Sequence, residues 1–131
     1  MSSEAITRND LTTILNTLLP LKPSVYSGAW TASSTSATNA RVTDDVVLPA
    51  GIYVVTVSTP YTTGNDPLIV IKKNGVEDYT TLLSGRAGAY ASRVVILELT
   101  EQTTVACYSA GSASTTYQAL ERGGLKAVRI A

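Results

Sequence analysis

The chain has 131 residues, the length of one domain, with 10 basic and 10 acidic side chains, no histidine and a single cysteine. Without histidine there is no Ser-His-Asp or Cys-His nucleophilic site and no His-ligated zinc, and one cysteine makes neither an intrachain disulfide nor a thiolate cage. Proteins that bind duplex nucleic acid normally carry a basic surplus, whereas the net charge here is zero. These counts argue against a nucleic-acid partner and against most catalytic chemistry.

The unusual feature of the composition is its hydroxyl content. Serine and threonine account for 32 residues, whereas charged residues make up only 15% of the chain. Threonine, valine and isoleucine together number 39, and β-branched side chains fit a pleated strand better than a helix. The composition therefore predicts an all-β domain, and the short hydroxyl side chains are expected to form an uncharged exterior.

Only residues 1–20 have the periodicity of a helix. Apolar side chains recur at spacings of three and four, at Leu11, Ile14, Leu15 and Leu18, which places them on one helical face. An isolated helix of about twelve residues is marginal in water, so this apolar stripe needs a cover. Two covers remain open: the β domain of the same chain, or the same helix from neighbouring subunits.

No segment predicts export or membrane insertion. The first ten residues lack a basic stretch followed by an apolar run, and uninterrupted apolar stretches such as 94–97 are far too short to cross a bilayer. We therefore expect no signal peptide, synthesis in the cytoplasm and no membrane insertion. The lone Cys107 lies in a strand-like run without a neighbouring basic residue, which predicts a buried and unreactive thiol.

After a proline-rich linker at 21–23, residues 24–131 are predicted to form strands and turns. The Ser/Thr-rich tract 31–39 is expected to be an exposed loop or an edge strand, and residues 60–67 are expected to be a loop. The turn at 49–51 either joins two antiparallel neighbours or carries the chain between sheets. Eight or nine strands are predicted, at residues 25–30, 41–48, 52–59, 68–73, 76–83, 93–100, 103–109, 115–120 and 125–130.

Two of these segments carry more specific signals. Asn74-Gly75 separates two apolar runs, and a type I′ hairpin turn requires the positive φ that these residue types tolerate. The strand at 93–100 is apolar at four successive positions, 94–97, and is therefore apolar on both of its faces. Such a strand is expected in the middle of the fold or in a contact between subunits.

Eight or so antiparallel strands in about 110 residues suit a two-sheet jelly-roll sandwich. Three stretches, LPAGIYVVTV at 48–57, IKKNGVEDY at 71–79 and SRVVILELTEQTTVACYS at 92–109, resemble in kind and order the trimeric jelly roll of the tumour necrosis factor and complement globular-head superfamily. The closing GGLKAVRIA matches the place of that superfamily's final strand. The resemblance covers roughly residues 41–130 and implies a homotrimer.

The sequence shows no collagen stalk, phenylalanine, cysteine pair or secretory leader, unlike the familiar members of that superfamily. It is similar in kind to the short trimeric modules carried by bacteriophage virions and some bacterial genomes, in which an N-terminal helix precedes a Ser/Thr-rich jelly roll. That resemblance implies a three-helix collar formed by Leu11, Ile14, Leu15 and Leu18. It also implies a place in a virion or on an extracellular surface.

Carboxylate pairs are the remaining route to catalysis. Asp44-Asp45 and Glu77-Asp78 are adjacent in sequence, but neighbours on a strand point to opposite faces and do not meet on one substrate. We therefore predict no catalytic residue, no cofactor and no metal ligand. Two alternatives stay open: distant carboxylates that converge as in a glycosidase, and a calcium ion held by oxygens near Asp44-Asp45 and residues 62–66.

The aromatic residues are the better candidates for binding, because seven of the eight are tyrosines. Tyr61 and Tyr90 fall in predicted loops that also contain Asn65, Asp66 and Arg86. A tyrosine combines an apolar ring with a hydrogen-bonding tip, and with neighbouring amide, carboxylate and guanidinium groups it suits a sugar or a protein surface. These five residues are the predicted ligand contact, and ordinary loop solubility is the alternative.

The leading functional hypothesis is a non-enzymatic structural or adhesive module. In this hypothesis the chain is a trimeric component of a phage virion, in a tail or head fibre, that binds a host-surface protein, a glycan or another virion protein. The alternative is a monomeric carbohydrate-binding module whose helix folds back on the sandwich.

Overall fold

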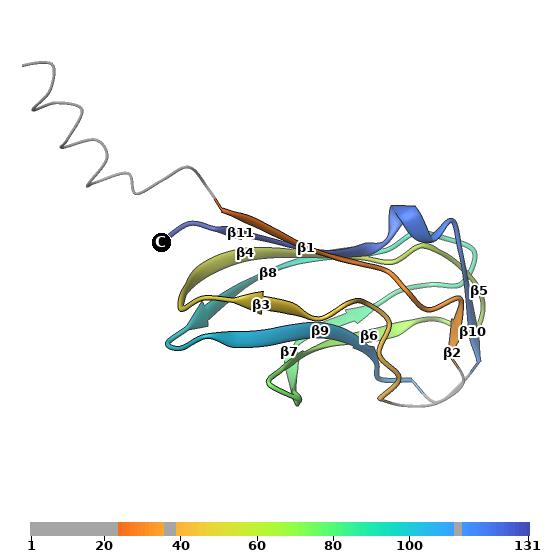
Figure 1. Cartoon of the computed structure of the whole chain (residues 1–131). Helices are drawn as coiled ribbons and strands as arrows, with labels where there is room; N and C mark the ends of the chain where they lie inside the picture. The colour runs from red at the N-terminus through yellow and green to blue at the C-terminus, as the bar shows by residue number, and fades with distance from the viewer. Residues whose placement is uncertain (1–23, 36–38, 112–113) are drawn as a thin grey trace, which may run out of the picture.

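A computed structural model describes residues 24–35, 39–111 and 114–131 of the chain (Figure 1). The helix predicted at 1–20 and the linker at 21–23 lie outside the described residues. The described residues form eleven strands and one short 3-10 helix: β1 (Val25–Ala29), β2 (Ser34–Thr35), β3 (Val46–Leu48), β4 (Gly51–Ser58), β5 (Tyr61–Gly64), β6 (Leu68–Lys73), β7 (Val76–Ser84), β8 (Ser92–Leu99), β9 (Thr103–Ser109), β10 (Thr115–Gln118), η1 (Leu120–Arg122) and β11 (Gly124–Arg129).

The strands form two four-stranded sheets that stack face to face, with a small third sheet across one end (Figure 1). The order in one large sheet is β1-β11-β4-β8, and in the other it is β3-β9-β6-β7. The small sheet has the order β2-β10-β5. Every strand pairing is antiparallel. The predicted all-β, antiparallel jelly-roll sandwich is confirmed, and the third sheet is an addition to it.

The core lies between the two large sheets. Successive residues of β4 alternate between buried and half-buried positions, because side chains on a strand point in turn to its two faces. Tyr53, Val55 and Val57 of this strand point inward and are almost fully buried. The other large members of the core cluster come from both large sheets, from β10 of the small sheet and from the segment between β1 and β3: Trp30, Val42, Val46, Leu48, Ile69, Ile71, Leu83, Leu97, Leu99, Val105, Tyr117 and Leu125.

The predicted hairpin at Asn74-Gly75 is confirmed. It joins β6 to β7, and its two residues have φ values of 50° and 81°, the positive values that a type I′ turn requires. The turn at residues 49–51 carries the chain from one large sheet to the other, because β3 and β4 belong to different sheets. This result decides between the two roles that the sequence left open.

Three predictions about the strands were wrong. The described residues contain eleven strands rather than eight or nine. Residues 60–67 are not only a loop, because β5 lies within them and pairs with β10. The single strand expected at 41–48 is reduced to β3, preceded by isolated bridges at Arg41 and Thr43. In each case the pairing partner lies far away in the sequence, where local patterns carry no signal.

The expected uncharged exterior is also only part of the role of the hydroxyl groups. The buried polar side chains among the described residues are all threonine or serine: Thr35, Thr43, Thr59, Thr62, Thr81, Thr103, Ser109 and Thr115. Each buried side-chain oxygen in the described part of the chain has a hydrogen-bond partner, as burial of a polar group requires. The Thr43 hydroxyl, for example, accepts a hydrogen bond of 2.9 Å from the backbone N–H of Cys107.

Candidate functional site

The outer face of the sheet β1-β11-β4-β8 carries an apolar row that crosses all four strands. Val25 pairs with Val128, Val128 pairs with Val54, and Val54 pairs with Ile96. These four side chains lie side by side on the face that points away from the core. A row of four aliphatic side chains on an open sheet face is unusual, because a sheet with one solvated face normally alternates apolar and polar residues.

Neighbouring residues widen this row into a patch. Val94 and Ile96 of the edge strand β8 are 61% and 62% exposed, and Ile130 beyond β11 is 52% exposed. Ile52 of β4 lies on the same face and accepts a backbone hydrogen bond from Ile130. We call this patch the apolar face and define it as residues Val25, Ile52, Val54, Val94, Ile96, Val128 and Ile130.

The apolar strand predicted at 93–100 is therefore β8, but it does not lie in the middle of the fold. It is an edge strand, because β4 is its only neighbour in its sheet. Leu97 and Leu99 point into the core, whereas Val94 and Ile96 point away from it. The first expectation for this strand was wrong, and the alternative, a contact between subunits, stays a prediction.

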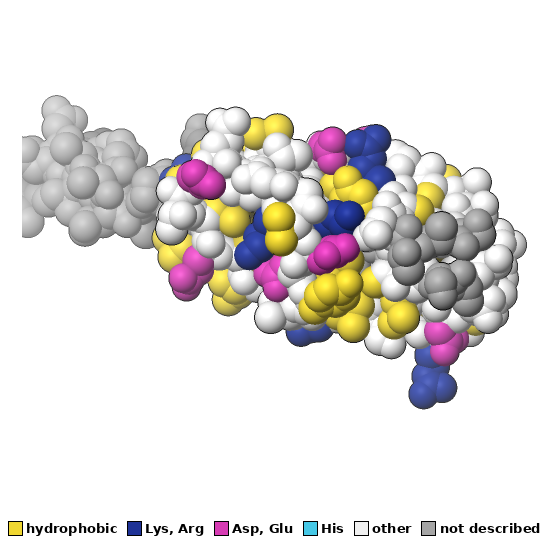
Figure 2. Space-filling view, turned by 90° about the horizontal axis from the view of Figure 1, so that it is seen from below, with side chains coloured by type: hydrophobic (Ala, Val, Ile, Leu, Met, Phe, Trp, Pro, Cys, Tyr) yellow, Lys and Arg dark blue, Asp and Glu magenta, His cyan; other side chains and the backbone are white. Residues whose placement is uncertain are grey.

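The outer face of the other large sheet is different (Figure 2). Basic and acidic side chains are scattered among the apolar ones on this face. Lys72 lies 3.9 Å from Glu77 and 4.3 Å from the centre of the Tyr108 ring. At the β6-β7 turn end of the same sheet, Lys73 lies 3.1 Å from Asp78, and hydrogen bonds from Thr80 are the largest cause that holds the pKa of Asp78 below its usual value. Only the β1-β11-β4-β8 sheet therefore presents a continuous apolar row.

The loops that the sequence selected as a ligand contact do lie together. The rings of Tyr61 and Tyr90 meet edge to face with their centres 5.6 Å apart. Thr62 holds the two segments in place, because its buried hydroxyl donates to the carbonyl oxygens of Arg86 and Ala89 at 3.0 and 3.4 Å. The tyrosine pair thus rests on a fixed backbone.

The other predicted contact residues have structural partners. The side-chain amide of Asn65 donates to the carbonyl oxygen of Ser114 at 2.8 Å. The carboxylate of Asp66 accepts from the backbone N–H of Ala87 at 2.8 Å. Arg86 is exposed, and its backbone carbonyl accepts the hydrogen bond from Thr62, the residue after Tyr61. The two tyrosines are consequently the members of the predicted set that meet through their side chains.

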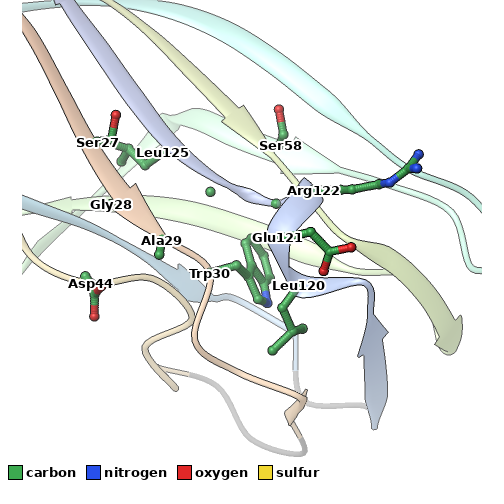
Figure 3. Close-up of a pocket in the computed structure, with 12 residues that line it drawn as sticks. Ser27, Gly28, Ala29, Trp30, Asp44, Ser58, Leu120, Glu121, Arg122 and Leu125 are labelled. Atoms are coloured by element: carbon green, nitrogen blue, oxygen red, sulfur yellow. The ribbon is translucent and has the colours of Figure 1, made fainter.

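A cleft of about 560 Å³ opens where η1 lies beside the sheet β1-β11-β4-β8 (Figure 3). Ser27 and Ser58 line it from β1 and β4, Leu120 and Glu121 line it from η1, and the buried Trp30 lies at its floor. The Ser27 and Ser58 side chains point to the same side of the sheet in the close-up. The ring of Trp30 packs 4.9 Å from that of Tyr117, which fixes the floor.

A second cleft, of about 340 Å³, adjoins the first at Ser58 and Arg122. Ser58, Tyr90 and Ser92 line it, and the Arg122 guanidinium carbon lies 5.8 Å from the centre of the Tyr90 ring. Arg122 and Ser58 line both clefts. Arg122 is not among the predicted contact residues, because it is 32 positions from Tyr90 and no local pattern relates them.

The described residues offer no group of three or more cysteine, aspartate or glutamate side chains arranged to hold a metal ion. Cys107 is buried, as predicted, and burial raises the pKa of its thiol to about 12. Among residues 24–35, 39–111 and 114–131 there is no helix long and apolar enough to cross a membrane. The predicted trimer contacts Leu11, Ile14, Leu15 and Leu18 lie outside the described residues.

Comparison with known proteins identifies the fold. No protein-family model and no curated protein sequence matches the chain. Among solved structures, Eiger TNF from S. frugiperda is similar with a TM-score of 0.65 at 11% identity, over 85% of this chain and 94% of that one. Two structures of murine APRIL, at pH 8.5 and pH 8.0, are similar with TM-scores of 0.59 and 0.54 at 13% and 11% identity, each over 83% of this chain and 100% of that one. The chain therefore has the jelly-roll fold of tumour necrosis factor proteins.

Proposed function

We propose that this chain is a non-enzymatic module that assembles with copies of itself through the apolar face. The observation that carries the proposal is the row formed by Val25, Val128, Val54 and Ile96 across four strands. Exposed apolar patches that are rimmed by polar residues mark sites of protein association. The next row along the same strands is polar at Ser27, Lys126 and Thr56, which gives the patch such a rim.

A second copy of the chain is the occupant that fits this face best. The row itself contains no charged side chain, and the charged residues Lys126 and Glu98 lie at its two edges, where they pair with Thr56 and Ile52. The face therefore offers a partner mainly apolar contact. Interfaces between identical subunits are more apolar than other interfaces. The number of subunits in the proposal is three, which rests on the resemblance of the sequence to trimeric jelly rolls.

The N-terminal segment supports the same arrangement. β1 begins at Val25, which is itself a member of the apolar row. Ser24, the residue before β1, therefore lies beside the apolar face, where its carbonyl accepts a hydrogen bond from the backbone N–H of Arg129. We propose that Leu11, Ile14, Leu15 and Leu18 form a three-helix contact that continues the assembly beyond the β domain.

The biological setting in this proposal is a phage virion, in a tail or head fibre, or another extracellular surface. A charge content of only 15%, a hydroxyl-rich composition and the absence of histidine suit a surface that assembles and adheres better than one that performs acid–base catalysis. The module would bind a host surface or another virion protein. The second candidate is a monomeric carbohydrate-binding module, and the meeting of Tyr61 and Tyr90 is the observation that favours it.

Charge substitutions on the two large sheets test the proposed interface. Ile96→Lys places a charge in the middle of the apolar row, whereas Val76→Lys places one on β7 of the other sheet, at a side chain that is 69% exposed. In an assembled chain the first lysine would be buried in a mainly apolar contact, at a cost of several kcal/mol. An exposed substitution in a single chain changes stability by about 0.5 kcal/mol or less.

Sedimentation velocity should therefore show a single-chain mass for Ile96→Lys and an unchanged, larger mass for Val76→Lys, with both variants folded by circular dichroism. Val94→Lys serves as a second variant of the apolar face. Equal masses for Ile96→Lys, Val94→Lys and the unaltered chain would contradict the proposed interface. Deletion of residues 1–20 separates the alternatives, because loss of assembly supports the trimer, whereas lower stability of a chain that was monomeric throughout supports the carbohydrate-binding module.

A further inference from the structure

We propose that the two clefts beside Arg122 bind a neutral sugar. We call them together the sugar cleft, defined by Ser58, Tyr90, Ser92, Glu121 and Arg122. The proposal deepens the adhesive part of the proposed function by naming a ligand class and its contacts. It does not depend on assembly, because all five residues belong to one chain.

Tyr90 provides a platform for the apolar face of a sugar ring. Its side chain is 50% exposed, and the edge-to-face contact with Tyr61 supports it from one side. The next residue, Ala91, forms two hydrogen bonds with Thr59. Its N–H donates to the Thr59 hydroxyl at 3.0 Å, and its carbonyl accepts from the Thr59 N–H at 2.8 Å. An exposed aromatic ring on a fixed backbone loses little freedom when a ligand packs on it.

The groups around this ring match the rim of a sugar. Arg122 supplies hydrogen-bond donors, Glu121 supplies acceptors, and Ser58 and Ser92, which pair across β4 and β8, supply hydroxyl groups that do both. Sugar hydroxyls likewise donate and accept. The cleft therefore offers partners of each kind around one aromatic platform.

The balance of charge favours a neutral ligand over an anionic one. The larger cleft is lined by one basic side chain, Arg122, and two acidic ones, Glu121 and Asp44. Lys126 of β11 adds a second basic side chain nearby. A site for phosphate or sulfate would be expected to gather a cationic surplus. Of the large apolar side chains that line the larger cleft, Trp30 and Leu125 are buried and Leu120 is half-buried, so this cleft offers a peptide few exposed apolar anchors.

The dimensions of the clefts are suitable for a small ligand. Their volumes of about 560 and 340 Å³ fall within the range of small-molecule sites. Because Arg122 and Ser58 line both, a ligand that occupies the two clefts in succession would meet Arg122 at its centre. This arrangement suits two linked sugar units, one on each side of the guanidinium group.

Saturation-transfer difference NMR on the full chain tests the proposal, with the methyl glycosides of glucose, galactose, mannose, fucose and N-acetylglucosamine as probes. Each probe has about a dozen non-hydrogen atoms, and the chain should therefore bind at least one of them with a Kd on the order of 1 mM. Tyr90→Ala and Arg122→Ala should each weaken that binding about tenfold or more. Tyr79→Ala, which removes an exposed tyrosine from β7 in the other sheet, should leave it unchanged.

Trp30 gives an independent readout, because it is the only tryptophan in the chain and lines the larger cleft. Its fluorescence should change with the sugar that gives the NMR signal and should saturate at the same concentration. Absence of binding by all five glycosides would overturn the proposal, and so would equal binding by the unaltered chain and Tyr90→Ala. If the chain is a monomer in solution but still binds the sugar, only the proposed assembly is contradicted, and the sugar-binding proposal stands.

Discussion

Buried threonine and cysteine side chains show how single residues hold this fold. Thr43 contacts Cys107 of β9, and both residues are buried. The Thr43 hydroxyl donates to the Asp44 carbonyl and accepts from the Cys107 N–H. Thr62 performs a similar task at the end of the sandwich. A hydroxyl that satisfies a backbone group in this way contributes about 1 kcal/mol. A β-branched residue thus provides both packing and a hydrogen bond.

The buried thiol of Cys107 predicts a specific dependence of stability on pH. Its ordinary pKa is 9.0, and burial raises the pKa in the folded chain to about 12. The unfolded chain therefore releases a proton first, so this contribution to stability is fully present below pH 9 and is lost as the pH rises from about 9 to 12, by about 1.4 kcal/mol per pH unit. Urea unfolding at pH 8 and pH 10.5, under reducing conditions, measures this loss.

Cys107→Ala provides the control, because burial also raises the pKa of Tyr53 and Tyr117. The variant keeps those tyrosines and lacks the thiol, so it should lose less stability than the unaltered chain between the two pH values. Parallel losses in the two proteins would show that the thiol does not contribute.

At the scale of elements, local signals predicted the β6-β7 hairpin and the long strands, whereas distant pairings escaped them. The turn of this hairpin is indicated by two adjacent residues, Asn74 and Gly75. β10 falls within the strand predicted at 115–120, but β5 was missed because its partner is distant: Thr62 pairs with Tyr117 across 55 positions. For β8, the run at 94–97 correctly indicated two apolar faces. It did not distinguish a central strand from an exposed one, since both produce the same sequence.

The candidate site shows the same division. Tyr61 and Tyr90 were predicted because their loops combine aromatic and polar residues in short stretches. Arg122 and Glu121 were missed because η1 follows a left-handed residue, Ala119 with φ of 54°, which is a conformation that alanine rarely adopts. A helix of three residues is too short to show helical periodicity in the sequence. The apolar face was likewise invisible as a row, because its members come from four strands.

Two glycines at turns distinguish backbone strain from steric overlap. Gly75 has φ of 81°, and an added Cβ would meet nothing within 4 Å, so Gly75→Ala should lower the free energy of unfolding by about 1 kcal/mol through backbone strain alone. Gly123 has an ordinary φ of −102°, but its Cβ would overlap Cδ of Pro60 and lie 2.8 Å from the Pro60 nitrogen. Gly123→Ala should therefore cost about 1–3 kcal/mol through crowding.

Urea unfolding of both variants gives the two values. The Gly75→Asn variant is the matched control, because asparagine tolerates positive φ better than alanine, and it should recover part of the loss. Equal stability of Gly75→Ala and the unaltered chain would contradict the type I′ assignment of this turn.

At the scale of the whole molecule, the two outer faces of the sandwich differ in chemistry. One face mixes charged and apolar side chains and suits water (Figure 2). The other carries the apolar face, with the sugar cleft at the end where η1 lies (Figure 1). Ser58 and Ser92 point outward from the same strands as Val54 and Ile96. A ligand site and an assembly surface thus share one sheet and remain distinguishable by their chemistry.

The mass of the full, unaltered chain in solution tests the proposed assembly most directly. Light scattering after size-exclusion chromatography, across the micromolar range, measures that mass without any substitution. We expect a mass near three times the 13.7 kDa of one chain, stable to dilution. A mass of one chain throughout this range would contradict assembly through the apolar face.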